Sequence, residues 1–245
     1  MGKITFTMLS LFFCATIAVA AQKEFEKDKI KTSAGDLIIT FVGHGTIMMS
    51  FGGKIIHVDP VTQMADYTKM PKADLILITH EHPDHFDLSA INLIKTAKTK
   101  IVATETVARQ ISDVTIMKNG DIRTIGDFRI EASPAYNLVN MRSPGKPFHP
   151  QGIGNGYIIT LGNKRLYIAG DTGNTLEMKN LKDIDVAFLP MNLPYTMTPE
   201  MVADAAKAFH PKILYPYHYG KTDTAKLTEL LQDTSGIEVR IRQMQ

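Results

Sequence analysis

The sequence predicts a single α/β domain, and three observations favour this fold class. The chain has 245 residues, 44% of them hydrophobic, which is enough to bury one large core. Short β-branched apolar runs of strand length alternate with helical patterns through the middle of the chain. Several of these runs end directly in histidine or aspartate. The polar chemistry of the chain is therefore concentrated at strand ends.

The first part of the chain predicts a meander of strands. Residues 22–32 are charged and are expected to form a short solvated lead-in. Strands are expected over residues 37–42, 47–51 and 54–58. Glycine-containing turns join them, and the glycine pair between the second and third strands suits a tight hairpin.

The remaining elements alternate along the chain. Thr198 followed by Pro199 and an acid predicts a capped helix start. Residues 138–154, rich in proline and glycine, predict a loop long enough to contact a substrate. The other expectations are helices over residues 87–96, 105–111, 198–209 and 225–231, and strands over 73–79, 101–103, 122–125, 128–132, 157–161, 164–169, 186–190, 213–216 and 237–241.

The segment His80-Glu81-His82-Pro83-Asp84-His85 indicates a metal site. It follows an apolar strand, and side chains two residues apart on an extended segment share a face. His80 and His82 can therefore bind one ion while Asp84 and His85 turn toward a second. A solvated polar loop is the alternative, but packing or solubility hardly explains three histidines in six residues. Asp171 and His218 also follow strands.

Two further residues are candidates for supporting such a site. His44 lies between two glycines and is expected to make a hydrogen bond to a metal-binding side chain. Asp59 ends the third strand and is expected to orient a metal-bound histidine, although capping a turn is the alternative.

The N-terminus predicts an export signal over residues 1–21, leaving residues 22–245 as the mature domain. A short positive start precedes an apolar stretch that is too short and too interrupted by Thr and Ser for a membrane span. We therefore expect a periplasmic or secreted protein. Cys14 would serve a lipoprotein signal, but Phe13 precedes it where such signals carry a small residue. Cys14 is the only cysteine and lies within the predicted signal. The mature chain would therefore have no thiolate ligand, which leaves His, Asp and Asn to bind a metal.

Composition argues against a nucleic-acid partner. The formal net charge is +2, and basic residues are interspersed with acidic ones without forming a stripe. We expect a small-molecule substrate, and the oligomeric state is left open.

The pattern resembles a known family. The His80-x-His82-x-Asp84-His85 motif, followed by Asp171 and His218, is similar to the metallo-β-lactamase superfamily over nearly the whole mature chain. The segments Phe41-Val42-Gly43-His44-Gly45, Asp59-Pro60 and Tyr217-His218-Tyr219 resemble the branch of broad-specificity metal-dependent hydrolases that includes ascorbate-phosphate lactonase-like proteins.

This resemblance implies an αββα sandwich of two mixed β-sheets flanked by helices. It assigns one ion to His80 and His82 and the other to Asp84, His85 and His218, with Asp171 bridging the two. The ions would be zinc, one or two per chain. A metal-bound hydroxide would then attack an ester, lactone, amide or phosphodiester, with Asp84 orienting ligands or moving protons.

One departure from the family pattern concerns the first ion. The family supplies a third histidine after a Pro-Ala-aromatic turn, where this chain has Asn137. An amide oxygen is a weaker zinc ligand than an imidazole. His149 is a candidate replacement, a solvated loop position is its alternative, and a single ion at the second site is a third possibility. A binding protein of the same fold with little turnover therefore remains an alternative function.

Overall fold

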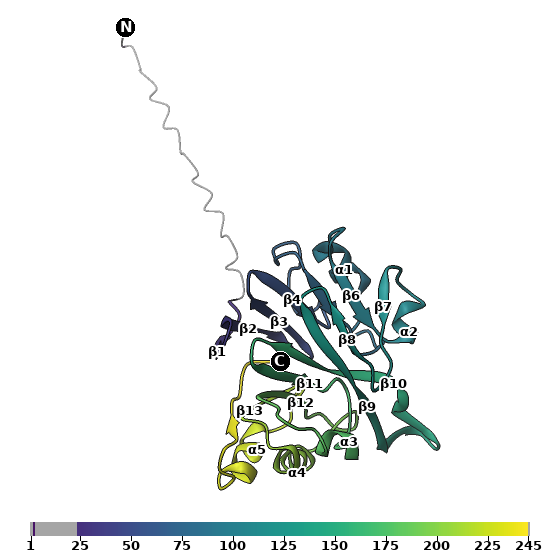
Figure 1. The fold of residues 1–245 in the computed structure, drawn as a ribbon, viewed down its shortest axis with the longest axis vertical. Coiled ribbons are helices and arrows are strands. Elements are labelled where there is room, and N and C mark those ends of the chain that lie inside the picture. The colour runs from purple at the N-terminus through teal and green to yellow at the C-terminus, as the bar shows by residue number, and fades with distance from the viewer. Residues whose placement is uncertain (1, 3–23, 245) are drawn as a thin grey trace.

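The computed structural model describes residue 2 and residues 24–244, and it contains two seven-stranded β-sheets. The sheets lie between outer layers of helices, with α1 and α2 on one side and α3, α4 and α5 on the other (Figure 1). This arrangement is the predicted αββα sandwich. Apart from Gly2, the predicted export signal lies outside the described residues.

The first sheet contains the N-terminal strands in chain order. Its antiparallel part pairs β1 to β4, and its parallel part continues through β5, β6 and β7. The strands are β1 (Lys27–Thr32), β2 (Gly35–Gly43), β3 (Thr46–Phe51), β4 (Lys54–Val58), β5 (Leu75–Leu77), β6 (Lys100–Ala103) and β7 (Val114–Ile116).

The second sheet repeats this order of pairing. Its first four strands are antiparallel and its last three are parallel. The strands are β8 (Ile122–Ile125), β9 (Phe128–Ser143), β10 (Lys146–Leu161), β11 (Lys164–Ile168), β12 (Val186–Pro190), β13 (Ile213–Tyr217) and β14 (Glu238–Val239). Parallel strands deliver their carboxyl ends to the same edge, so residues that follow β5, β11 and β13 can meet between the sheets.

The helices pack on the outer faces and begin at capping side chains. Asp87 accepts hydrogen bonds from the backbone at the start of α1, and Thr198 caps α4. Most of the buried apolar side chains form one continuous core between and around the sheets, and a second cluster packs α1 and α2 on the first sheet. The helices are α1 (Leu88–Ile94), α2 (Glu105–Ala108), α3 (Leu176–Lys179), α4 (Pro199–Phe209) and α5 (Thr224–Leu231). No helix in residues 24–244 is long and apolar enough to cross a membrane.

Two sequence-based expectations are wrong. Residues 27–32 of the expected solvated lead-in form strand β1, which buries only Ile30 and is held by pairing with β2. A strand with one buried side chain has no alternating apolar pattern to reveal it. Residues 138–154 are not a loop, because β9 and β10 continue through them as a long hairpin.

The hairpin was hidden by its prolines and glycines, which usually indicate loops. Pro144 and Gly145 form the turn, where Gly145 has φ of +73°. Farther along β10, register shifts accommodate Pro147 and the segment between His149 and Gly154. The hairpin therefore brings His149 back over the strand ends of both sheets.

Candidate metal centre

Histidine and aspartate side chains from both sheets converge at the strand ends in two adjacent groups of four. We call the first group cluster one (His80, His82, His149 and Asp171) and the second cluster two (His44, Asp84, His85 and His218). Within each cluster, one donor atom per residue lies within 4.8 Å of all the others. The segment after β5 contributes to both clusters.

Cluster one is nearly closed to solvent. His80 Nε2 and His149 Nε2 lie 3.1 and 3.2 Å from His82 Nδ1. His149 Nε2 also lies 3.2 Å from Asp171 Oδ2, whereas His80 Nε2 is 3.9 Å from it. Only His82 is partly exposed, since the other three members are buried. Four donors therefore surround one small volume.

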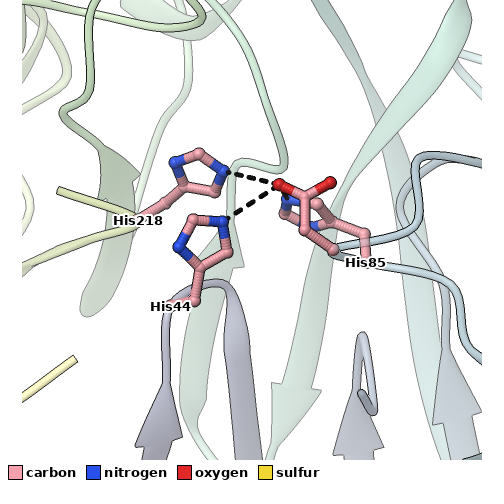
Figure 2. Close-up of side chains that lie close together, drawn as sticks. His44, His85 and His218 are labelled. Carbon is pink, nitrogen blue, oxygen red and sulfur yellow. Dashed lines mark hydrogen bonds and ion pairs between the residues drawn. The ribbon is translucent and has the colours of Figure 1, made fainter. Parts of the chain in front are cut away.

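Cluster two gathers around the Asp84 carboxylate. Figure 2 shows the imidazoles of His44, His85 and His218 turned toward this group. Asp84 Oδ2 lies 3.0 Å from His44 Nε2, 3.5 Å from His218 Nε2 and 3.8 Å from His85 Nε2. The Asp84 side chain is 42% exposed, so this cluster has an open side.

Asp171 lies between the clusters. Besides its contact with His149, its Oδ2 is 3.3 Å from His218 Nε2 and its Oδ1 is 3.3 Å from His85 Nε2. Burial opposes ionisation of this carboxyl, but His218, His85 and His149 hold its pKa well below the ordinary value. The carboxylate is therefore charged and touches members of both clusters, as a bridging ligand must.

The charges of the surrounding groups differ with their neighbours. Burial lowers the pKa of His80 well below its ordinary value, with a further contribution from His85. Burial also disfavours charge on His85, but Asp171 and Asp59 raise its pKa well above the ordinary value. For Asp84, burial opposes ionisation, but its contacts with His218 and His44 outweigh burial and lower the pKa. Both carboxylates that face the clusters are thus ionised.

One buried carboxylate orients a histidine in each cluster. His85 Nδ1–H donates to Asp59 Oδ2 at 2.8 Å. Thr79 Oγ1 donates to the same oxygen at 2.7 Å and therefore accepts from His80 Nδ1–H at 2.9 Å. The Thr79 amide donates to Asp59 Oδ1. Asp59 thus holds the Nδ1–H of both rings, directly for His85 and through Thr79 for His80, and directs Nε2 of each ring into its cluster, where the neutral ring would offer it to an ion.

His149 and Asn137 lie opposite each other in the β9–β10 pairing. His149 Nδ1–H donates to the Tyr195 carbonyl at 3.1 Å, which leaves Nε2 facing cluster one. The Asn137 amide donates to the Tyr195 and Thr196 carbonyls, and its oxygen accepts from backbone amides of β9. The structure therefore brings His149 into the cluster and leaves Asn137 outside it.

Backbone geometry positions the histidines of cluster two. His44 and His218 have φ of 52° and 48°, a left-handed conformation that is unfavourable for non-glycine residues. The His44 amide donates to the Met244 carbonyl at 2.7 Å, and the His218 amide donates to the His44 carbonyl at 2.9 Å. Gly45 must lack a side chain, because a Cβ there would lie 2.6 Å from His85 Cε1. The C-terminal segment thus helps to build the site.

Sequence reasoning missed three of these supporting residues. Thr79 directly precedes His80, so its position could have indicated an orienting role. Nothing in the sequence pairs Met244 with His44 or Tyr195 with His149, because those contacts are made by backbone carbonyls across long sequence separations.

The two clusters fit divalent ions by three criteria. Two donors ~2.0–2.1 Å from a tetrahedral zinc ion lie about 3.4 Å apart, which is close to the 3.0–3.9 Å distances given above. Among the described residues, His85 Nε2, Asp171 Oδ1 and His218 Nε2 are buried without a hydrogen-bond partner. The donors are nitrogen and oxygen atoms only, a set that suits zinc, iron or manganese. Such polar atoms are expensive to bury unless they bind something.

Comparisons with known proteins agree with this geometry. Residues 38–218 match the family model of the beta-lactamase superfamily domain. A UPF0173 metal-dependent hydrolase from Geobacillus thermodenitrificans is 31% identical, with 74% of this chain and 84% of that protein covered. One from Thermococcus kodakarensis is 32% identical over 74% of this chain and 84% of that protein.

Solved structures extend the comparison to the fold. A crystal structure of a protein from Parabacteroides distasonis, described as a metal-dependent hydrolase, is 50% identical with a TM-score of 0.86. It covers 91% of this chain and 100% of that one. Igni18, a metallo hydrolase from Ignicoccus hospitalis, is 25% identical with a TM-score of 0.69 over 84% of this chain and 94% of that one. The chain therefore belongs to the metallo-β-lactamase superfamily, as one of its metal-dependent hydrolases.

Proposed function

We propose that the protein is an exported hydrolase that holds two zinc ions, one in each cluster, and cleaves an ester, lactone, amide or phosphodiester bond in a small molecule. The observation that carries this proposal is the position of Asp171 between two groups of donors. When bound, two such ions supply an activated water at neutral pH and neutralise charge on the substrate.

The proposed ligands follow from the contacts. His80, His82 and His149 would hold the first ion, and Asp84, His85 and His218 the second, with Asp171 shared. His44 is close enough to Asp84 to act either as a further ligand or as its hydrogen-bond partner. Asp59 and Thr79 keep two of the rings in the tautomer that can bind a metal.

Asp84 and His44 are the groups best placed to move a proton. Asp84 Oδ2 is partly exposed and lies 3.0 Å from His44 Nε2, whose side chain is 22% exposed. A proton taken at Asp84 Oδ2 could pass to His44 Nε2 when that nitrogen is unprotonated, and the imidazolium would then release its Nδ1 proton to solvent. Asp84 would in this way combine the holding of an ion with proton transfer.

A cavity of about 400 Å³, lined by members of both clusters, supports a small-molecule substrate. This size lies within the usual range for ligand pockets. The apolar stretch near the N-terminus supports export. The alternative function as a binding protein without turnover depended on Asn137, and the contact of His149 with His82 favours the catalytic proposal instead.

The test is metal-dependent turnover. Protein stripped with a chelator is assayed before and after reloading with zinc, manganese or iron on a panel of nitrophenyl esters, lactones, anilides and phosphodiesters. We expect activity on at least one class that disappears with the metal and returns on reloading. Stoichiometric metal binding with no turnover on any class would instead support the binding protein.

A further inference from the structure

The lining of the cavity beside the two clusters includes an arginine for which the catalytic proposal has no use. Arg142 lies on β9, near the tip of the β9–β10 hairpin, and lines this cavity together with Phe148, Asn192 and Tyr195. The same cavity is also lined by cluster residues, including His82, Asp84 and His218. A molecule bound in it could therefore contact both the metal centre and Arg142.

Aromatic packing holds the arginine in place. The Arg142 guanidinium carbon lies 5.5 Å from the centre of the Phe148 ring, within the range of a cation–π contact. Phe148 in turn packs edge-to-face on Tyr195 at 5.1 Å. Both rings are connected to cluster one, since Phe148 precedes His149 and the Tyr195 carbonyl accepts from His149 Nδ1. This stack connects the exposed Arg142 side chain to the segments that carry and orient His149.

The charge of Arg142 is not neutralised by the protein. In residues 24–244 it makes no ion pair, and among the described residues lining the cavity it is the only lysine or arginine. The two acids of that lining, Asp84 and Asp171, belong to the metal centre. A guanidinium presents paired N–H donors whose geometry matches a carboxylate or a phosphate. Its natural partner here is therefore an oxyanion of the bound molecule.

We infer that Arg142, supported by Phe148 and Tyr195, forms a subsite for an oxyanion, and that the substrate carries a carboxylate or phosphate group beside the bond that is cleaved. This inference rests on the proposed function, because it places the scissile bond at the metal centre. It narrows the substrates from any ester, lactone or amide to anionic ones.

Binding of three matched probes to the metal-loaded protein tests the subsite without requiring turnover. N-phenylsuccinamic acid carries a carboxylate, its phosphonate analogue carries a phosphonate, and N-phenylsuccinamide is neutral. Calorimetric titration compares the parent with Arg142→Met, Arg142→Lys and the control Lys146→Met, which removes an exposed charge from the same hairpin outside the cavity lining.

We expect at least one anionic probe to bind the parent about 10- to 100-fold more tightly than the neutral one, as is typical of hydrogen bonds to a charged group. This preference should fall below about threefold in Arg142→Met, persist in part in Arg142→Lys and remain in Lys146→Met. Whichever anionic probe binds more tightly would then show whether the subsite prefers a carboxylate or a phosphate.

Two results would overturn the subsite. One is equal binding of charged and neutral probes, and the other is an anion preference that survives Arg142→Met, which would mean that the metal centre alone holds the anion. Failure of the proposed function looks different. Arg142-dependent binding without any metal-dependent turnover would retain the subsite and reject the hydrolase, whereas turnover without the charge preference would do the reverse.

Discussion

The two clusters are built from the same residue types but are held in different ways. In cluster one, side-chain hydrogen bonds fix the rings: His80 is held by Thr79 and His149 by the Tyr195 carbonyl. In cluster two, His85 is fixed similarly by Asp59, but His44 and His218 are positioned by backbone hydrogen bonds and left-handed dihedral angles. His218 Nδ1 has no hydrogen-bond partner among the described residues.

The two clusters also differ in how far their side chains are exposed to solvent. In cluster two His44 and Asp84 are 22% and 42% exposed, although His85 and His218 are buried. In cluster one only His82 is partly exposed, and His80 and His149 are 5% and 6% exposed. A buried site with oriented ligands is preorganised and excludes water, while an open one can admit a substrate. We therefore expect cluster one to retain its ion more firmly and the ion in cluster two to be the more accessible of the two.

The largest effect should come from Asp171, which the two clusters share. Asp171→Ala is expected to reduce metal content from about two ions per chain to less than one, and to reduce activity by more than about 100-fold. Losing only the hydrogen-bond partner of a metal ligand already lowers metal affinity or activity by about 10- to 100-fold, and this variant loses a ligand itself. Elemental analysis and steady-state kinetics measure both quantities. Asp204→Ala, which removes a carboxylate on α4, is the control. If Asp171→Ala loses only one ion, Asp171 does not bridge the two clusters.

Asp59 and Thr79 allow the clusters to be weakened together or separately. Asp59→Asn should lower the metal affinity of both clusters by about 10- to 100-fold, since its carboxylate supports His85 directly and His80 through Thr79. Thr79→Val should weaken cluster one alone. Two-step metal titrations measure the two affinities.

The control for Thr79→Val is Thr160→Val, which removes a buried hydroxyl that has no partner among the described residues. Equal weakening of both steps by Thr79→Val would contradict the separate support of the two clusters.

Tyr219 tests the contribution of the C-terminal segment to cluster two. Its hydroxyl donates to the Arg242 carbonyl at 2.6 Å and accepts from the Met244 amide, next to the carbonyl that holds His44. Tyr219→Phe should reduce the free energy of unfolding by about 1–2 kcal/mol and weaken only the second metal-binding step. Denaturant unfolding and metal titration measure these effects, with cluster one as an internal control. A weaker first step would show that the segment acts on the whole fold.

A buried histidine outside both clusters, His57, should affect stability at low pH without affecting metal binding. His57 on β4 donates from Nε2 to the Pro71 carbonyl, and burial lowers its pKa to about 4 from 6.5 in the unfolded chain. As pH falls from 6.5 to 4, the unfolded state takes up a proton that the folded state refuses, so stability decreases by about 3 kcal/mol.

Urea unfolding of metal-free protein at several pH values measures this loss. His57→Gln should flatten that part of the profile. An unchanged profile in the variant would assign the pH dependence to the cluster histidines instead.

The sequence was most informative where strands end in polar residues. The segment after β5 indicated a metal site because three histidines and an aspartate fall within six residues, and the strands around it have clear apolar patterns. Strand β1 was hidden because it buries only Ile30. The β9–β10 hairpin was hidden because its prolines and glycines are tolerated through register shifts, which depend on tertiary pairing rather than on local propensity.

In the site, too, local sequence indicated side chains but not the contacts that depend on the tertiary structure. Side chains could be assigned as candidates from their residue types, but the partners of His149 and His44 could not, because both are backbone carbonyls. A carbonyl is present at every residue, so it leaves no signal in the sequence.

The most direct test of the two-ion account is the number of metal ions per chain, measured by elemental analysis of protein purified without chelator. We compare the parent with His149→Ala and with His57→Gln as a control for loss of a buried histidine outside the clusters. The account predicts about two ions in the parent and the control, and about one in His149→Ala. A single ion in all three proteins would contradict it, since cluster one would then hold no metal.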